Sequence, residues 1–324
     1  MLTITSLTVP SSPARVRDSA RPPLRVALVQ HRWQADRDAL HAELFAGIAE
    51  AAKLGARVVF LPELTLSRYP AATPGGANPG DQAEDLLTGP TFTFAAKAAA
   101  EHGVLVHASL YERDSAANGT SHADGLGFNT AILVAPNGRL VGRTRKLHIP
   151  VTAGYYEDTY FRGGPADDAY PVHTVDLLDG ARIGMPTCWD EWFPEVARLY
   201  SLRGAEIIAY PTAIGSEPDH PDFDTQPLWQ HVIVGNGIAN GTFMVVPNRY
   251  GQEGSLTFYG SSFISDPYGR ILAQAPRDES AVLVADLDLD QRGDWLTLFP
   301  FLATRRPDTY GQLTAPVAAT HPLG

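Results

Sequence analysis

Apolar and polar positions along this chain follow two distinct patterns. Short apolar runs rich in β-branched residues predict buried strands, as in "LRVALVQ" at 24–30. From Asp36 to Leu54 the apolar residues recur at helical spacing, which predicts a helix that stops at Gly55. The same spacing predicts helices at 91–102, from near Pro194, and over roughly 226–240.

The rest of the chain is dominated by strand patterns. A hairpin is predicted at 128–146, because two β-rich runs are joined by Asn137-Gly138, the strongest short turn signal. The other runs that predict strands are 57–63, 104–112, 181–188, 205–211, 242–249, 261–267, 270–276 and 281–289. Mixed strand signals with interspersed helices predict one α/β domain over 24–324, ending in a C-terminal tail. Residues 1–23 are predicted to be a flexible leader.

Composition narrows the class of protein. The 324 residues are 44% hydrophobic and 19% charged, which is typical of a soluble globular protein. A formal net charge of −11 argues against nucleic acid as a partner. No apolar run approaches the roughly 20 residues that span a bilayer, and the leader lacks a secretory pattern. We therefore expect a cytoplasmic protein without a membrane partner.

Cysteine and histidine usage limits the chemistry. The single cysteine excludes an internal disulfide framework and every CxxC metal or redox site. The ten histidines include no HExxH pair, and no GxxxxGK[ST] phosphate loop is present. We expect neither a metal nor an organic cofactor. A serine hydrolase is not indicated either, because there is no GxSxG motif.

Three ionisable residues stand at predicted strand ends: Glu63, Lys146 and Cys188. Side chains at the carboxyl ends of strands in an α/β sheet share a crevice where ligands bind. Each residue alone has a structural explanation, and for Glu63 and Lys146 that explanation is favoured. Cys188 could be a small core residue, Glu63 a turn cap, and Lys146 a solvated strand end.

Together the three residues form a chemical unit. Asp190, Glu191 and Glu195 follow Cys188, and negative neighbours disfavour a thiolate, so a reactive cysteine needs positive help. Glu63 can accept the thiol proton, and the Lys146 ammonium can stabilise the oxyanion formed by attack on a carbon–nitrogen centre. The backbone N–H of Trp189 is a second expected oxyanion donor.

The motifs "FLPE" around Glu63, "RKLHIP" around Lys146 and "CWDEWFPE" around Cys188 resemble the three signatures of the nitrilase (carbon–nitrogen hydrolase) superfamily. The resemblance runs from about Leu24 to Tyr310. It implies a four-layer α-β-β-α sandwich and a homodimer or larger homo-oligomer. It also implies that Glu157, in "GYYEDTYF", is a catalytic partner of Lys146 that helps to position water.

Within the superfamily, "YPTAIGSEP" (210–218) and "FYGSSFI" (258–264) most resemble the branch that hydrolyses N-carbamoylputrescine. The resemblance implies a thiol amidohydrolase that releases ammonia and carbon dioxide. A cationic small-molecule substrate suits the acidic residues in the motif loops. The expected substrate-binding residues are Trp189, Glu191, Glu217 and Tyr69, whereas Asp190 is expected to cap the following helix.

Other substrates and one other class of protein stay open. The same machinery could act on an aliphatic amide, a nitrile or a β-ureido acid. A non-catalytic binding protein that kept the fold is the alternative from another class, and an intact set of Glu63, Lys146 and Cys188 argues against it.

Overall fold

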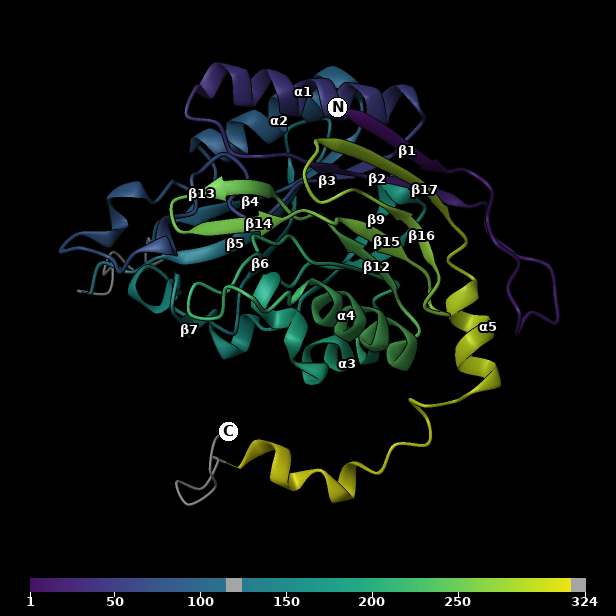
Figure 1. Cartoon of the computed structure of the whole chain (residues 1–324). Helices are drawn as coiled ribbons and strands as arrows, with labels where there is room; N and C mark the ends of the chain where they lie inside the picture. The colour runs from purple at the N-terminus through teal and green to yellow at the C-terminus, as the bar shows by residue number, and fades with distance from the viewer. Residues whose placement is uncertain (115–123, 316–324) are drawn as a thin grey trace.

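The computed structural model describes residues 1–114 and 124–315 and arranges them in four layers, α-β-β-α (Figure 1). Helices α1 (Arg37–Lys53) and α2 (Pro90–His102) cover the outer face of a seven-stranded sheet. Helices α3 (Pro194–Leu202) and α4 (Gln226–Asn240) cover the outer face of a six-stranded sheet. The predicted α/β sandwich is confirmed.

The seven-stranded sheet has the order β1-β17-β2-β3-β4-β5-β6. Its strands are β1 (Leu2–Ser6), β17 (Ala281–Leu287), β2 (Leu24–Gln30), β3 (Val58–Phe60), β4 (Leu105–Glu112), β5 (Phe128–Val134) and β6 (Leu140–Arg145). The central neighbours β2, β3 and β4 run parallel, and β5 and β6 form the antiparallel hairpin predicted from the sequence. Parallel strands place their carboxyl ends at one edge of the sheet, which is where Glu63 follows β3.

The six-stranded sheet has the order β16-β15-β12-β11-β10-β9. Its strands are β16 (Ile271–Gln274), β15 (Phe263–Ser265), β12 (Phe243–Val246), β11 (Ile207–Ala209), β10 (Ala181–Gly184) and β9 (Val172–Val175). Strands β10, β11 and β12 are parallel. Two small ribbons complete the fold, β7 (Val151–Thr152) with β8 (Tyr155–Tyr156) and β13 (Tyr250–Glu253) with β14 (Leu256–Tyr259).

Separate apolar clusters fill the spaces between layers. The cluster between the two sheets joins residues of both, including Phe60 from β3 and Phe243 from β12. A second cluster packs α1 and α2 on the first sheet, and a third packs α3 and α4 on the second. Strands covered on both faces read as continuous apolar runs, which is why β2 was predictable to the residue. Each fully buried aliphatic or aromatic side chain contributes about 1.5–3 kcal/mol.

Local sequence signals account for most element ends. Asp36 caps α1 by accepting hydrogen bonds from the backbone N–H groups of Asp38 and Ala39. Gly55 follows that helix with φ +87°, a conformation that glycine adopts without strain. Strand β3 ends before Pro62, which has no N–H to donate, so it is shorter than the run predicted at 57–63.

Residues 1–23 were expected to form a flexible leader, but the structure places a strand at their start. Strand β1 pairs in parallel with β17 at the edge of the seven-stranded sheet. Beyond β1, the Arg15 and Arg21 side chains form ion pairs with Asp288 and Asp290. The alternating apolar and polar residues of "LTITS" are a short strand pattern, and β17 offers them an unpaired sheet edge. The charged and proline-rich residues that follow obscured this signal.

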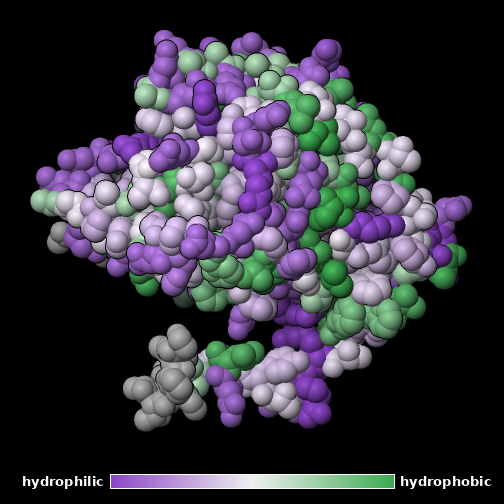
Figure 2. All heavy atoms as spheres, in the orientation of Figure 1, coloured by the Kyte–Doolittle hydropathy of each residue, from purple (hydrophilic) through white to green (hydrophobic). Residues whose placement is uncertain are grey.

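The C-terminal tail follows α5 (Gln291–Leu298) and lies beyond α3 and α4 (Figure 1). Phe301 and Tyr310 of the tail line a hollow together with Arg198 of α3 and Asn236 of α4. Figure 2 shows hydrophilic residues over much of the visible face, with hydrophobic ones gathered near the β16 and β17 edge. Residues 316–324 of the predicted tail lie outside the described part. Among the described residues, no helix has both the length and the apolar character needed to cross a membrane.

Candidate active site

Glu63 is held at the end of β3 by contacts from three other segments. Its Oε1 accepts hydrogen bonds from Asn129 Nδ2 at 2.7 Å and from Lys146 Nζ at 3.0 Å. Its Oε2 accepts from the backbone N–H of Ala213 at 2.8 Å. The carboxylate is fully buried, so each of these donors compensates for lost hydration. Glu63 thereby joins the β3 end, the β5–β6 hairpin and the loop after β11.

The backbone around Glu63 is fixed by a buried arginine. Arg249, in the loop between β12 and β13, donates to the carbonyl oxygens of Glu63 at 2.7 Å and of Leu64 at 2.9 Å. Leu64 has φ +48°, a strained conformation for a residue with a side chain. Arg249 is in turn paired with Glu253 at 2.7 Å. We infer that Arg249 positions Glu63 by holding this turn.

Lys146 lies between two carboxylates. Its Nζ donates to Glu63 Oε1 at 3.0 Å and to Glu157 Oε2 at 2.7 Å, and all three side chains are buried. The two carboxylates raise the pKa of Lys146 well above its usual value, despite the opposing effect of its burial. One ammonium cannot balance two buried carboxylates. Burial, opposed by Lys146, accordingly raises the pKa of Glu157 to about 7.

Tyr69 supports Glu157 instead of facing outward. Its hydroxyl donates to Glu157 Oε1 at 2.8 Å, and its backbone N–H donates to Glu253 Oε2 at 2.8 Å. The ring is 2% exposed and packs against Tyr155 and Phe258. Tyr69 was expected among the substrate-binding residues. Because its hydroxyl is already bonded to Glu157, we infer that it positions that carboxylate.

Cys188 lies in a strained turn between β10 and α3. It has φ +44°, and its backbone N–H donates to the carbonyl oxygen of Pro211 at 3.0 Å. A 3₁₀ turn, Cys188–Trp192, begins at the cysteine, which places the Trp189 backbone directly after the thiol. The side chain packs with Trp229 and Tyr259 and is 5% exposed. Positive φ at a non-glycine residue is a feature of functional turns.

The Cys188 thiol is not acidified at rest. Burial raises its pKa well above the usual value, and the charges of Glu63 and Glu157 add to that increase. Lys146 lowers the pKa, but its effect is smaller than that of burial. The positive charge that the sequence analysis expected near Cys188 is present as the Lys146 ammonium, but it does not produce a thiolate at rest. Such a thiol needs a base to remove its proton before it can act as a nucleophile, and the charge of the nearby Glu63 acts on it.

Asp190 connects the cysteine turn to the lysine segment. Its Oδ2 accepts from the Thr187 N–H at 3.1 Å, within the turn of Cys188. Its Oδ1 accepts from the backbone N–H and from Nδ1 of His148, at 3.0 and 2.7 Å. Asp190 was expected to cap α3, but it caps the turn that carries Cys188. This network fixes Cys188 relative to Lys146, two residues before His148.

Glu217 extends from the loop after β11 and is half-buried. Burial raises its pKa and nearby His220 lowers it, and no hydrogen bond to the carboxylate is found in the described part of the chain. Its charge raises the pKa of Tyr155, as does that of Cys188. Gly215 permits this loop, because a Cβ there would lie 2.2 Å from the Thr257 carbonyl oxygen. Glu217 and Cys188 thus share Tyr155 as a neighbour.

Asn129 and Arg249 were not predicted from the sequence. Asn129 is a buried polar residue within the apolar strand β5, and Arg249 is a buried cation just after β12. Both break an otherwise apolar segment, which is the signal that could have found them. Their partners, Glu63 and its backbone, are remote in sequence, so no local pattern indicates the pairing.

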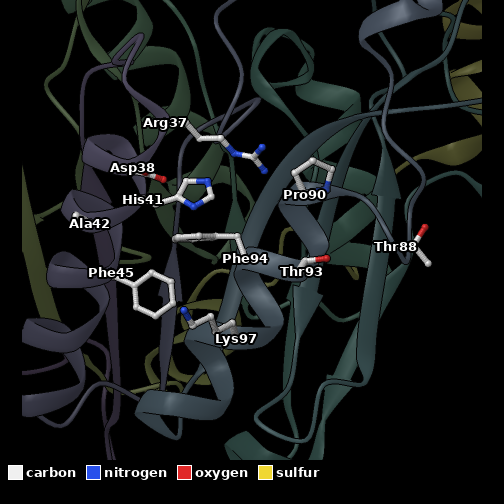
Figure 3. Close-up of a pocket in the computed structure, with 10 residues that line it drawn as sticks. All are labelled: Arg37, Asp38, His41, Ala42, Phe45, Thr88, Pro90, Thr93, Phe94 and Lys97. Carbon is white, nitrogen blue, oxygen red and sulfur yellow. The ribbon is translucent and has the colours of Figure 1, made fainter.

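A surface pocket lies away from this cluster. A cavity of about 600 Å³ is found between α1 and α2, where Arg37, His41 and Lys97 surround the rings of Phe45 and Phe94 (Figure 3). None of its lining residues belongs to the cluster around Cys188. Within residues 1–114 and 124–315, no group of three His, Cys, Asp or Glu side chains is arranged to hold a metal ion.

A buried thiol, a buried carboxylate and a buried lysine, brought together from both sheets of a four-layer sandwich, are the set that the resemblance to carbon–nitrogen hydrolases implies. The chain belongs to the carbon–nitrogen hydrolase family, whose model matches residues 25–296. It is 34% identical over 294 residues to a citrullinase of Francisella tularensis, covering 90% of this chain and 98% of that one. It is 36% identical over 271 residues to an N-carbamoylputrescine amidase of Arabidopsis thaliana, covering 81% and 86%.

A solved structure agrees with this assignment. A carbon–nitrogen hydrolase from Helicobacter pylori superposes with a TM-score of 0.80 at 29% identity. The match covers 91% of this chain and all of the other. The protein is a hydrolase of non-peptide carbon–nitrogen bonds.

The Glu157 carboxylate leads to a first prediction. Glu157→Gln keeps the shape of the side chain but removes the charge that pairs with Lys146. We expect the fold to persist and kcat to fall roughly 10- to 100-fold, as for one lost charge-assisted hydrogen bond. In the wild type, kcat/KM should rise with pH through about 7, because Glu157 becomes charged there. This acid limb of the pH profile, the rise of kcat/KM through about pH 7, should be absent in Glu157→Gln.

Tyr69→Phe is the matched control for this experiment. The Tyr69 hydroxyl bond lowers the pKa of Glu157 by stabilising its charged form. Its removal should shift the acid limb to higher pH while leaving kcat at alkaline pH within a few-fold of wild type. A Glu157→Gln enzyme with wild-type kcat and an unchanged limb would show that Glu157 has no part in turnover.

Proposed function

We propose that the protein is a thiol amidohydrolase that cleaves N-carbamoyl amines, with N-carbamoylputrescine as its best substrate. The observation that carries the substrate proposal is Glu217, a half-buried carboxylate that forms no ion pair within residues 1–114 and 124–315 and shares the neighbour Tyr155 with Cys188. A partly desolvated carboxylate without a partner favours a cation. An ammonium group at the far end of the substrate would supply that cation.

The first half of the reaction forms a thioester. Glu63 accepts the Cys188 proton as the sulfur bonds to the carbamoyl carbon and the C=O electron pair moves onto oxygen. The Lys146 ammonium and the Trp189 N–H stabilise that oxyanion. The adduct collapses by breaking the bond to the terminal nitrogen, which takes the proton from Glu63 and leaves as ammonia. A carbamoyl thioester remains on Cys188.

The second half hydrolyses the thioester. Glu63 takes a proton from water, whose oxygen bonds to the thioester carbon, and the carbon–sulfur bond breaks. The Cys188 sulfur regains the proton from Glu63. The released carbamic acid decomposes to the amine and carbon dioxide. Water and substrate together thus give the amine, carbon dioxide and ammonia. Glu157 holds Lys146 in place through both halves.

Charged residues near Glu217 favour substrates that end in an amine over substrates that end in a carboxylate. The exposed residues that follow it include Asp219 and Asp222, with His220 between them. A negative potential there opposes an N-carbamoyl amino acid whose distal group is a carboxylate. Citrulline is the second candidate, because a relative is named as a citrullinase. Citrulline carries both an ammonium and a carboxylate at its far end, and His220 is the nearby group that could face the carboxylate.

Ammonia release across a matched panel tests this function. The panel contains N-carbamoylputrescine, citrulline, N-carbamoyl-β-alanine, an uncharged N-carbamoyl alkylamine and a simple aliphatic amide. We expect kcat/KM to be highest for N-carbamoylputrescine, then citrulline, and lowest among the N-carbamoyl compounds for N-carbamoyl-β-alanine. A preference for N-carbamoyl-β-alanine would overturn the proposal that the substrate is cationic. Activity on the simple amide alone would overturn the proposal that the substrate carries an N-carbamoyl group.

A further inference from the structure

Glu191 is a buried carboxyl group that forms no ion pair with any of the described residues. Its Oε1 accepts a hydrogen bond from Trp229 Nε1 of α4 at 2.8 Å, while its Oε2 has no partner among the described residues. The side chain is fully buried, and no cation forms an ion pair with it in the described part of the chain. An isolated buried carboxylate is costly, so such a group takes up a proton instead.

The electrostatic surroundings of Glu191 oppose a negative charge. Burial raises its pKa well above the usual value, and the charges of Glu63 and Asp190 raise it further. Lys146 is the cation that opposes this effect, but its ammonium is already bonded to two carboxylates. The titratable groups that interact with Glu191 are Glu63, Lys146, Cys188, Asp190, Tyr210 and Tyr259. Among these groups of the described chain, Lys146 is the one cation.

The position of Glu191 is fixed relative to the nucleophile. It lies three residues after Cys188 in the same 3₁₀ turn, and its backbone carbonyl accepts from Asn236 Nδ2 at 2.9 Å. Its side-chain partner Trp229 packs in the same cluster as Cys188 and lies 5.4 Å from the Tyr259 ring. The unpartnered Oε2 therefore belongs to the surroundings of the thiol.

We propose that Glu191 works as a neutral carboxylic acid that offers the O–H on Oε2 to the uncharged N-carbamoyl end of the substrate. A protonated carboxyl both donates and accepts hydrogen bonds at that oxygen, and a ureido group needs both. This inference rests on the proposed function and assigns the two ends of the substrate to different residues. Glu217 binds the distal ammonium, and Glu191 binds the ureido group without a charge.

Three substitutions separate the neutral acid from a carboxylate. Glu191→Gln cannot ionise, but its amide keeps an acceptor for Trp229 and a donor in place of the O–H. This variant should therefore retain most of the wild-type kcat/KM. Glu191→Met removes both hydrogen bonds and should lower kcat/KM about 5- to 150-fold, as for an unsatisfied buried group. Glu191→Asp withdraws the carboxyl group and should resemble Glu191→Met. Thermal melting of each variant checks that the fold is intact.

Infrared spectroscopy tests the protonation state without turnover. The wild-type spectrum minus that of Glu191→Gln at pH 6.5 should show a protonated-carboxyl band that shifts in D₂O. Glu157 is present in both proteins, so its contribution cancels. No such band, or a Glu191→Gln enzyme as impaired as Glu191→Met, would overturn the proposal. A wild type inactive on every N-carbamoyl compound would instead overturn the proposed function, while the band would still report whether Glu191 is neutral.

Discussion

Cys188→Ala is expected to lower kcat/KM by about four orders of magnitude or more while leaving the fold intact. The thiol supplies the bond that divides hydrolysis into two steps, and no other residue of the chain is a cysteine. The substitution removes a single sulfur atom from a packed site, so the cost in stability should be about 1 kcal/mol. Ammonia release and circular dichroism measure the two effects separately.

Mass spectrometry gives the same experiment a positive readout. With a slowly hydrolysed substrate, the wild-type protein should gain the mass of the substrate minus ammonia on the peptide that contains Cys188. The Cys188→Ala protein should gain none. Substantial turnover in that variant, or an adduct on another residue, would refute thiol catalysis. Alkylation of wild-type Cys188 slower than that of free cysteine is expected as well, because burial keeps the thiol protonated at rest.

The parts of the site that the sequence predicted are those that follow a strong local signal. Glu63, Lys146 and Cys188 each stand at the end of a predicted strand, and the carboxyl ends of strands are where ligands bind. Glu157 has no comparable signal, and only the resemblance to a family singled it out. What the runs could not reveal is that Glu63 and Lys146 belong to one sheet and Cys188 to the other. Pairing between strands is set by tertiary packing.

The contacts that the sequence did not predict share one property. Asp190 and Tyr69 form hydrogen bonds to residues more than forty and eighty positions away, His148 and Glu157 respectively. Hydropathy patterns carry no information about such distant partners. The same holds for β1, whose place beside β17 depends on a strand near the other end of the chain. Homo-oligomer formation and a cytoplasmic location stay predictions.

Selectivity for a cationic substrate depends on Glu217, and its removal is expected to have the second large effect. If the carboxylate pairs with a substrate ammonium in a partly desolvated site, breaking the pair costs about 2–5 kcal/mol. Glu217→Gln should therefore lower kcat/KM for N-carbamoylputrescine by roughly 30-fold to a few thousand-fold. Because Glu217 is half-exposed, the lower part of that range is expected.

The uncharged N-carbamoyl alkylamine of equal length is the matched control. It never pairs with the carboxylate, so Glu217→Gln should change its kcat/KM by no more than a few-fold. Glu191→Gln, measured beside it, should affect charged and neutral substrates alike, because a neutral acid does not distinguish them. Equal losses on both substrates in Glu217→Gln would mean that Glu217 supports its loop and does not bind the amine. The ammonium would then require a different partner, and the order of substrates in the panel would lose its electrostatic explanation.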